Sequence, residues 1–298
     1  MAPKIFLTGV TGYVGGTTFS MLHETHPKYD YTLYVRNQDR AKVIAEKFPD
    51  VKFVYGDLDT VEIIEKKHLL KPMLLSIRLT LRTHPRLPKP SQKAWPLPIQ
   101  PNAQNITFIS QVQSYGDIKD IDRILNLPDE AIHKDVETII QSINSEAVKY
   151  LMVSPPVIYG AGRGLAHKQS FAITEIVRAT VDLGYTPIIG AGKAKWDNVH
   201  VEDLTALLAK AVEASQAPSK KENDSETWGR KGYYFVTTGE HQWDDLAQWI
   251  AEEVHRQGYI PEAKTKSVSM ENMINARYKA AVAWGTNSKT EKLASYKS

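Results

Sequence analysis

A glycine-rich turn near the start of the chain has the clearest chemical meaning. Glycines stand at positions 9, 12 and 15, after a short apolar run at residues 5–7 and before a helical pattern at 14–23. Gly9 permits a tight turn, Gly12 lets the backbone approach a pyrophosphate, and Gly15 lets the helix lie close to the strand. A strand, this turn and a helix together predict a phosphate-binding site for a dinucleotide.

Backbone N–H groups would make the contacts in such a site. A helix N-terminus has unpaired N–H groups and the positive end of the helix dipole, so it attracts phosphate. The residues expected to surround the pyrophosphate are Thr11, Gly12, Tyr13 and Val14. The alternative is a glycine-rich turn that binds no ligand.

The residue that ends the second strand bears on the choice of nicotinamide cofactor. An acidic side chain there accepts from the ribose 2′-hydroxyl and favours NAD. This chain has Arg36 at that place and Arg40 one helical turn later. Guanidinium groups favour a 2′-phosphate, so we expect NADP, with NAD as the alternative cofactor. Both arginines could also be ordinary solvated surface residues.

Strands and helices alternate along much of the chain. Short apolar runs predict strands at 5–7, 31–35, 51–55, 106–109, 150–153 and 232–236, and amphipathic patterns predict helices at 14–23, 38–48, 61–68, 130–143, 202–213 and 243–254. This alternation is typical of an α/β fold with a doubly wound parallel sheet, the Rossmann type. Ligands bind such sheets at the carboxyl ends of the strands.

We expect two parts in the chain. Residues 1–165 are predicted to form the NAD(P)-binding Rossmann domain. Residues 166–298 are predicted to form a mixed region, with a smaller substrate lobe and returning Rossmann elements near 196–237. The polar stretch at 215–227 reads as an exposed loop, and the aromatic residues of helix 243–254 are expected to pack in the core rather than bind substrate.

Composition excludes several function classes. The net charge is +3, but residues 66–116 hold eight Lys/Arg and no Asp or Glu, so the basicity belongs to one segment and does not predict nucleic-acid binding. No run is long and apolar enough to cross a membrane. The chain has no cysteine, which excludes disulfides and suits a cytoplasmic protein. The histidines show no metal-ligand spacing.

The alternation fails between residues 69 and 104. This stretch contains seven of the sixteen prolines, at positions 72, 85, 88, 90, 96, 98 and 101. Because proline breaks helices and removes donors from a strand ladder, we expect no central strand and no crossover helix there. A structureless stretch of this length is unusual inside a compact domain.

Five short motifs occur in a characteristic order: Thr8–Gly15, Gly56–Leu58, Ser110–Gly116, Ser154–Gly160 and Asn198–Leu204. Together they resemble the extended short-chain dehydrogenase/reductase family, the NAD-dependent epimerases and dehydratases, in an atypical and fungal-like form. The resemblance implies hydride transfer between a nicotinamide cofactor and a small carbonyl, alcohol or nucleotide-sugar-like substrate. Family members are often dimers, so it leaves a homodimer open.

The resemblance also implies roles for individual residues. Asp57 would accept from the adenine amino group, and Leu58 would pack on the ring. Tyr159 and His200 would lie near the substrate side of the sheet. The alternatives are a turn aspartate, a packed aromatic at a strand end and, favoured for His200, a structural histidine before a helix.

The expected catalytic residues depart from the family pattern. Active members pair a Ser or Thr with Tyr-x-x-x-Lys on the next helix. In this chain Ser110 lies beside the usual serine position, while His133 takes the tyrosine place and Glu137 the lysine place. The literal match at Tyr115 and Lys119 begins directly after a strand, in a glycine-containing turn, and we interpret it as a decoy.

Three interpretations of His133 stay open. It could act as the general acid/base, since an imidazole titrates near neutral pH without the help of a lysine. It could hydrogen-bond the cofactor without doing chemistry, or be an ordinary exposed histidine. Glu137 would repel phosphate but could accept from ribose hydroxyls. The predicted catalytic pair is therefore Ser110 and His133, and Glu137 is assigned to cofactor binding.

The stretch at 69–104 also admits a hypothesis about the gene. The family has its fourth strand there, and the degenerate codons of residues 71–83 can encode Glu-Ala-Asp-Val-Val-Val-Asn-Thr-Ala-Asp-Ala-Ser-Asp in another frame. Out-of-frame translation would explain the missing strand, and the alternative is a genuine proline-rich insertion. Three functions follow: an active enzyme, a non-catalytic regulator that binds NADP(H), or a damaged family member.

Overall fold

The computed structural model describes seven stretches of the chain: residues 2–56, 74–77, 114–116, 119–127, 134–142, 150–216 and 227–290. The chain folds into two compact units that use interleaved segments. The first unit takes residues 1–77, 144–174 and 198–239, and the second takes 78–143, 175–197 and 240–298.

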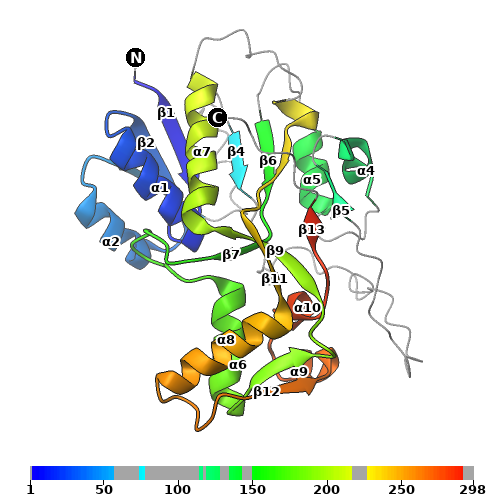
Figure 1. The fold of residues 1–298 in the computed structure, drawn as a ribbon. Coiled ribbons are helices and arrows are strands. Elements are labelled where there is room, and N and C mark those ends of the chain that lie inside the picture. The colour runs from blue at the N-terminus through cyan, green and yellow to red at the C-terminus, as the bar shows by residue number, and fades with distance from the viewer. Residues whose placement is uncertain are drawn as a thin grey trace. The chain divides into compact units, whose positions relative to one another are not determined.

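The first unit alternates strands and helices (Figure 1). Its elements are β1 (Lys4–Thr8), α1 (Tyr13–Thr25), β2 (Asp30–Val35), α2 (Gln38–Lys47), β3 (Lys52–Tyr55), β4 (Leu74–Ile77), β6 (Tyr150–Ser154), β7 (Val157–Tyr159), α7 (Val201–Gln216), η2 (Gly229–Lys231) and β10 (Tyr233–Phe235). Three further elements, α6 (Phe171–Leu183), β9 (Lys195–His200) and β11 (Gly239–Gln242), begin in one unit's range and end in the other's.

The strands of the first unit pair in parallel. β2 lies between β1 and β3, and β6 lies between β4 and β10. The end of β9 pairs in parallel with β7. Parallel ladders joined through helices confirm the predicted α/β Rossmann class.

Apolar spacing places α1 and α7 against the sheet. Phe19 and Leu22 of α1 are buried with Leu33 of β2 in one core cluster. Leu204 and Leu208 of α7 are buried in a second cluster with residues of β6 and β9. The two helices pack against each other beside β1 (Figure 1). The predicted core stripe of α7 is confirmed.

One prediction about the proline-rich stretch is wrong. Residues 74–77 form β4, which pairs in parallel with β6 from Leu74 opposite Tyr150 to Ile77 opposite Val153. These four residues are free of proline and follow Pro72, so every residue of β4 keeps its backbone donor. A strand here weakens the out-of-frame hypothesis, which relied on the strand being missing. The rest of 69–104 lies outside the described residues.

The second unit contains shorter elements. They are β5 (Ser114–Tyr115), α4 (Ile121–Leu125), α5 (Lys134–Gln141), β8 (Thr186–Ile189), α8 (Trp243–Arg256), β12 (Thr265–Val268), α9 (Met270–Asn275), α10 (Ala281–Trp284) and β13 (Lys289–Thr290). β12 pairs in parallel with β8, and β13 with β5.

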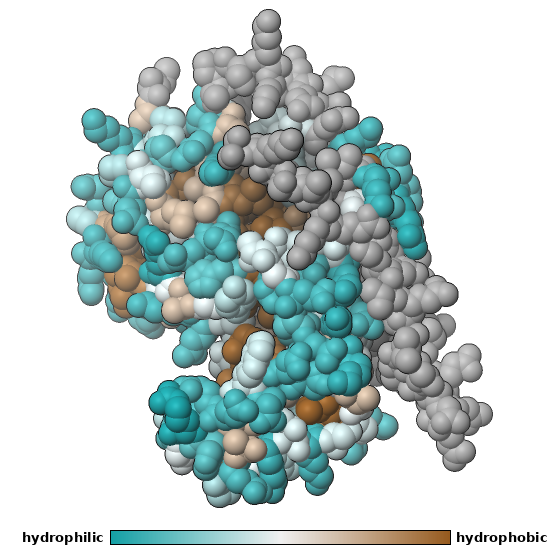
Figure 2. All heavy atoms as spheres, in the orientation of Figure 1, coloured by the Kyte–Doolittle hydropathy of each residue, from teal (hydrophilic) through white to brown (hydrophobic). Residues whose placement is uncertain are grey.

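The aromatic residues of α8 divide between core and surface. Trp243 is buried and packs edge-on against Trp196, but Trp249 is 61% exposed. The expectation that the aromatics of this helix pack in the core is therefore wrong for Trp249, which lies opposite the buried stripe formed by Ala247, Ala251 and Val254. Figure 2 shows that hydrophilic residues dominate the face drawn, with apolar residues in separate areas.

Several predicted elements fall partly or wholly outside the described residues. These are the helix at 61–68, the strand at 106–109, the ends of the helix at 130–143 and most of the loop at 215–227. Elsewhere the predicted strands and helices agree with the structure to within about three residues at each end.

Candidate functional site

Three glycines shape the turn that joins β1 to α1. Gly9 has a φ of +71°, a left-handed conformation that favours glycine. A Cβ on Gly15 would lie 2.4 Å from the Gly9 carbonyl oxygen, and one on Gly12 would lie 3.1 Å from it. Gly9 is therefore required for conformation, and Gly15 is required for the close approach of helix and strand, as predicted.

The N-terminus of α1 offers backbone donors. The Gly12 N–H donates to the Gly9 carbonyl at 2.8 Å, and the Gly16 N–H makes the first helical bond, to the Gly12 carbonyl at 3.0 Å. The N–H groups of Tyr13, Val14 and Gly15 precede that bond, so they suit an anion. No side chain caps the helix and its first turn has no acidic residue. The turn thus fits a pyrophosphate, with the Gly12 N–H used internally.

The side chain of Tyr13 is held by the protein. Its hydroxyl donates to the Gly160 carbonyl at 2.6 Å, and its own carbonyl accepts from the Thr17 hydroxyl at 2.7 Å. Burial raises the pKa of Tyr13 to about 12. The hydroxyl therefore remains a proton donor at neutral pH, and Tyr13 can offer a ligand its backbone N–H.

Two arginines stand at the end of β2 and in the first turn of α2. Arg36 follows the last residue of β2, and Arg40 lies on α2, whose N-cap Asn37 accepts from the Arg40 N–H at 2.9 Å. Both arginines are exposed, and neither guanidinium makes an ion pair within the described part of the chain. Two such cations near one helix N-terminus suit a phosphate monoester.

The end of β3 approaches β2 closely. Gly56 donates its N–H to the Val35 carbonyl at 3.2 Å, and a Cβ on Gly56 would lie 2.4 Å from the Tyr34 hydroxyl oxygen. A larger residue at position 56 would therefore require the Tyr34 side chain to move. Asp57 and Leu58, predicted to contact adenine, lie outside the described residues.

The predicted catalytic pair cannot be placed. Ser110 and His133 both lie outside the described residues, while Glu137 is half-buried on α5. The neighbouring Lys134 is buried and its Nζ donates to the Leu125 carbonyl at the end of α4. Lys134 therefore ties α5 to α4, a structural role that was not predicted.

His200 has the structural role that the sequence favoured. Its Nδ1 accepts the Glu202 N–H at 3.2 Å in the first turn of α7, which places the ring proton on Nε2. The ring packs edge-on against Tyr159, with centroids 5.2 Å apart. Tyr159 itself is 41% exposed at the end of β7.

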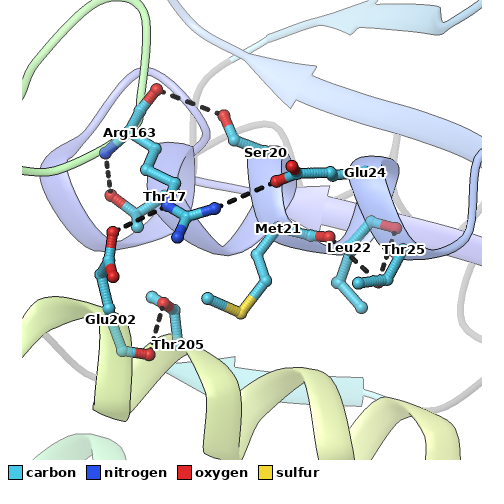
Figure 3. Close-up of polar contacts among 9 residues, drawn as sticks. All are labelled: Thr17, Ser20, Met21, Leu22, Glu24, Thr25, Arg163, Glu202 and Thr205. Atoms are coloured by element: carbon cyan, nitrogen blue, oxygen red, sulfur yellow. Dashed lines mark hydrogen bonds and ion pairs between the residues drawn. The ribbon is translucent and has the colours of Figure 1, made fainter.

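The segment after β7 contributes residues that the motifs did not identify. Arg163 donates its N–H to the Thr17 hydroxyl at 3.1 Å, and its side chain reaches Glu24 and Glu202 (Figure 3). The available signal was the spacing of Gly160, Gly162 and Gly164, which allows a backbone to lie close against a neighbour.

Two further classes of site receive no support. Within the described residues there is no group of three or more His, Asp or Glu arranged to hold a metal ion. Of the helices in those ranges, none combines the length and apolar character needed to cross a membrane.

Comparison with known proteins finds a matching family model and a curated relative. The family model described as "NAD dependent epimerase/dehydratase family" matches residues 131–223, which include α5, β6, β7 and α7. Among curated proteins the chain is similar to Oxidase ucsJ of Acremonium sp., with 29% identity over an alignment of 317 positions that covers 98% of this chain and 90% of that protein.

Solved structures share the fold at low sequence identity. The PbgP3 protein of Burkholderia pseudomallei aligns with a TM-score of 0.59 and 16% identity, over 90% of this chain and 86% of that one. The dTDP-glucose 4,6-dehydratase of Bacillus anthracis aligns with a TM-score of 0.54 and 12% identity, over 90% and 85%. At these identities the likeness concerns the fold.

Proposed function

We propose that the chain, which matches the model of the NAD-dependent epimerase/dehydratase family over residues 131–223, is a nicotinamide-dependent oxidoreductase, epimerase or dehydratase of the extended short-chain type. The observation that carries this proposal is the glycine turn between β1 and α1, with Gly9 at a φ of +71° and Gly15 in contact with the Gly9 carbonyl. The proposed substrate is a small carbonyl, alcohol or nucleotide-sugar-like molecule, and a homodimer and a cytoplasmic location complete the proposal.

The glycine turn would hold the pyrophosphate of the cofactor. The N–H groups of Tyr13, Val14 and Gly15 are the donors, and Thr11 lies beside them in the turn. When bound, a nicotinamide supplies a hydride acceptor or donor at its C4 atom. The structurally similar dehydratase of Bacillus anthracis was solved in complex with NAD, which agrees with a cofactor of this class.

We propose NADP as the preferred cofactor. Arg36 and Arg40 are exposed at the end of β2 and the start of α2, and neither is paired with a carboxylate of the described chain. A 2′-phosphate would satisfy both guanidinium groups, whereas the ribose 2′-hydroxyl of NAD would find no acidic acceptor at Arg36.

The proposed chemistry rests on position matching within the family. Ser110 would hold the substrate oxygen, and His133 would accept or donate the proton of that oxygen. Turnover of Ser110→Ala and His133→Ala should fall at least about tenfold against any substrate found for the wild type. Unchanged turnover in both variants would refute this assignment.

A second candidate function is a non-catalytic regulator that binds NADP(H). The observation that favours it is Glu137, which stands on α5 where active members have lysine. A damaged family member without either activity would fail both assays below.

Binding and turnover separate these candidates. Fluorescence titration with NADPH and NADH tests the site directly, and a panel of carbonyl, alcohol and nucleotide-sugar substrates then tests turnover. NADPH binding with turnover supports the enzyme, and NADPH binding without turnover across the panel supports the regulator. If the wild-type protein binds neither NADPH nor NADH, the proposed function is wrong.

A further inference from the structure

A closed ring of contacts joins the glycine turn to the segment after β7. The Tyr13 hydroxyl donates to the Gly160 carbonyl, and the Thr17 hydroxyl donates to the Tyr13 carbonyl and accepts from the Arg163 N–H. Arg163 then reaches Glu202 on α7. These contacts therefore join α1, the segment after β7 and α7, which are far apart in the sequence.

Arg163 is the charged centre of this ring. Its Nε lies 2.8 Å from Glu202 on α7, and its Nη1 lies 3.0 Å from Glu24 on α1. Figure 3 shows the guanidinium between the two carboxylates, with the Arg163 carbonyl facing Ser20. The hydrogen bond and charge of Glu202 raise the pKa of Arg163, and those of Arg163 lower the pKa of Glu202. One side chain thus links two helices.

Glycines let this segment lie directly on α1. A Cβ on Gly162 would lie 2.8 Å from the Thr17 hydroxyl oxygen and 2.9 Å from the Tyr13 ring. A Cβ on Gly164 would lie 3.0 Å from the Cα of Gly16. The backbone of residues 160–164, which we call the strap, is therefore packed against the first turns of α1.

His200 also connects the segment after β7 to the start of α7. The Glu202 N–H donates to His200 Nδ1, and a Cβ on Gly160 would lie 2.1 Å from His200 Nε2. Gly160 has a φ of +93°, so glycine is required for conformation as well as for space. Displacement of the strap would therefore disturb both Tyr13 and the start of α7.

We propose that Arg163 is a positioning residue for the phosphate-binding turn: by holding the strap on α1 through Glu24 and Glu202, it fixes Tyr13 and the first turn of that helix in the geometry that receives the cofactor pyrophosphate. This inference rests on the proposed function for its ligand. It assigns Arg163 no contact with the cofactor and no part in hydride or proton transfer.

The exposure of the ion pairs of Arg163 determines how large an effect its loss should have on stability and on ligand binding. The side chains of Arg163, Glu24 and Glu202 are 42%, 69% and 41% exposed, so each pair alone contributes little to stability. Two carboxylates on one guanidinium form a small network that restricts motion more than either pair. Loss of Arg163 should therefore weaken ligand binding without unfolding the protein.

The test compares Arg163→Gln with a matched control, Arg256→Gln. Arg256 makes an exposed ion pair with Glu253 on α8, so its loss removes an exposed Arg–Glu pair that belongs to the second unit. We expect NADPH affinity to fall about three- to tenfold in Arg163→Gln and to stay within about twofold in Arg256→Gln, with unchanged melting temperature in both. Arg163→Lys, which can keep one ion pair, should be intermediate.

Amide hydrogen exchange of the ligand-free protein provides a readout that does not depend on the cofactor. The N–H groups of Gly12, Gly16 and Gly162 are all hydrogen-bonded in the structure. In Arg163→Gln these amides should exchange several times faster than in the wild type, while the exchange rates of the α8 amides should stay unchanged. Glu24→Gln, which removes only one partner, should show a smaller change and serves if Arg163→Gln folds poorly.

The outcomes separate the two proposals. Weaker NADPH binding together with faster exchange at Gly12 and Gly16 supports the positioning role. Wild-type affinity and wild-type exchange in Arg163→Gln overturn it. A wild-type protein that binds neither NADPH nor NADH overturns the proposed function, and exchange in the same variants still decides whether Arg163 holds the turn.

Discussion

The turns after β1 and β2 follow neighbouring parallel strands, but they are built in opposite ways. In the first, Gly9 has a left-handed φ, a Cβ on Gly12 or Gly15 would crowd the Gly9 carbonyl, and Tyr13 is hydrogen-bonded to the strap. In the second, Arg36 is exposed, and its guanidinium makes no ion pair with the described part of the chain. The shape of the first turn is fixed by its backbone, whereas the second turn presents an exposed arginine side chain that can bind a ligand.

This difference predicts that the first turn governs binding of any dinucleotide, whereas the second governs the selectivity between NADP and NAD. A pyrophosphate site made of backbone N–H groups recognises a feature that all dinucleotides share, so a change there should affect every cofactor equally. A guanidinium distinguishes a 2′-phosphate from a 2′-hydroxyl, so a change at Arg36 should affect one cofactor and leave the fold intact.

The largest effect is expected at Gly15. In Gly15→Ala the new Cβ would lie 2.4 Å from the Gly9 carbonyl oxygen and 2.7 Å from its carbon, and these backbone atoms cannot swing away as the end of a flexible side chain could. We expect a loss of about 2–3 kcal/mol in the free energy of unfolding, measured by urea denaturation, and loss of both NADPH and NADH binding.

Gly9→Ala is the matched comparison for that variant. A Cβ on Gly9 has nothing within 4 Å, so its cost is the left-handed conformation alone, about 1–2 kcal/mol. If Gly15→Ala were as stable as the wild type and bound both cofactors normally, the close approach of α1 to β1 would not be what shapes the site.

An intermediate effect is expected at Arg36. Arg36→Glu should weaken NADPH binding about 10- to 100-fold, because a charge-assisted hydrogen bond is replaced by repulsion. NADH binding should stay the same or improve, since a carboxylate can accept from the 2′-hydroxyl. Parallel fluorescence titrations measure both affinities, and the melting temperature should not change. An equal loss for both cofactors would show that Arg36 does not read the 2′ position.

The same contrast explains how much the sequence could predict. The turn from Gly9 to Gly15 is contiguous, so its spacing alone predicts the strand, the turn and the helix, all of which the structure contains. The strap was not predicted, because the Arg163 N–H meets the Thr17 hydroxyl across 146 positions of sequence. Spacing of glycines indicates that a close contact exists but not which element it meets.

Two predictions failed for local reasons. The prolines of residues 69–104 predict no central strand, yet the four proline-free residues Leu74–Ile77 form a strand beside a parallel neighbour that supplies the ladder. The sequence predicts that the aromatic residues of helix 243–254 pack in the core, but Trp249 is exposed because it lies opposite the buried stripe of α8. The predictions for Ser110, His133, Asp57 and Leu58 stay predictions.

The smallest effect is expected at Tyr13, where a side chain supports the backbone-made turn. Tyr13→Phe removes the donor to the Gly160 carbonyl, 2.6 Å away, but keeps the buried ring. We expect a loss of about 1 kcal/mol in the free energy of unfolding, which is about the net contribution of one hydrogen bond. Binding of both NADPH and NADH should weaken about two- to fivefold. Equal weakening for both cofactors would assign Tyr13 to the common pyrophosphate site, in contrast to Arg36.

Alkaline pH sharpens this last test. Burial raises the pKa of Tyr13 from 10.0 to about 12, so the folded protein keeps the proton that the unfolded chain releases first. The contribution of Tyr13 to stability is therefore fully present below pH 10.0 and declines as the pH rises towards 12. Denaturation measured across that range should show a smaller loss of stability in Tyr13→Phe than in the wild type. Parallel losses in the two proteins would mean that the hydroxyl is not buried in this hydrogen bond, and the link between the glycine turn and the strap would then have to depend on Thr17 and Arg163 alone.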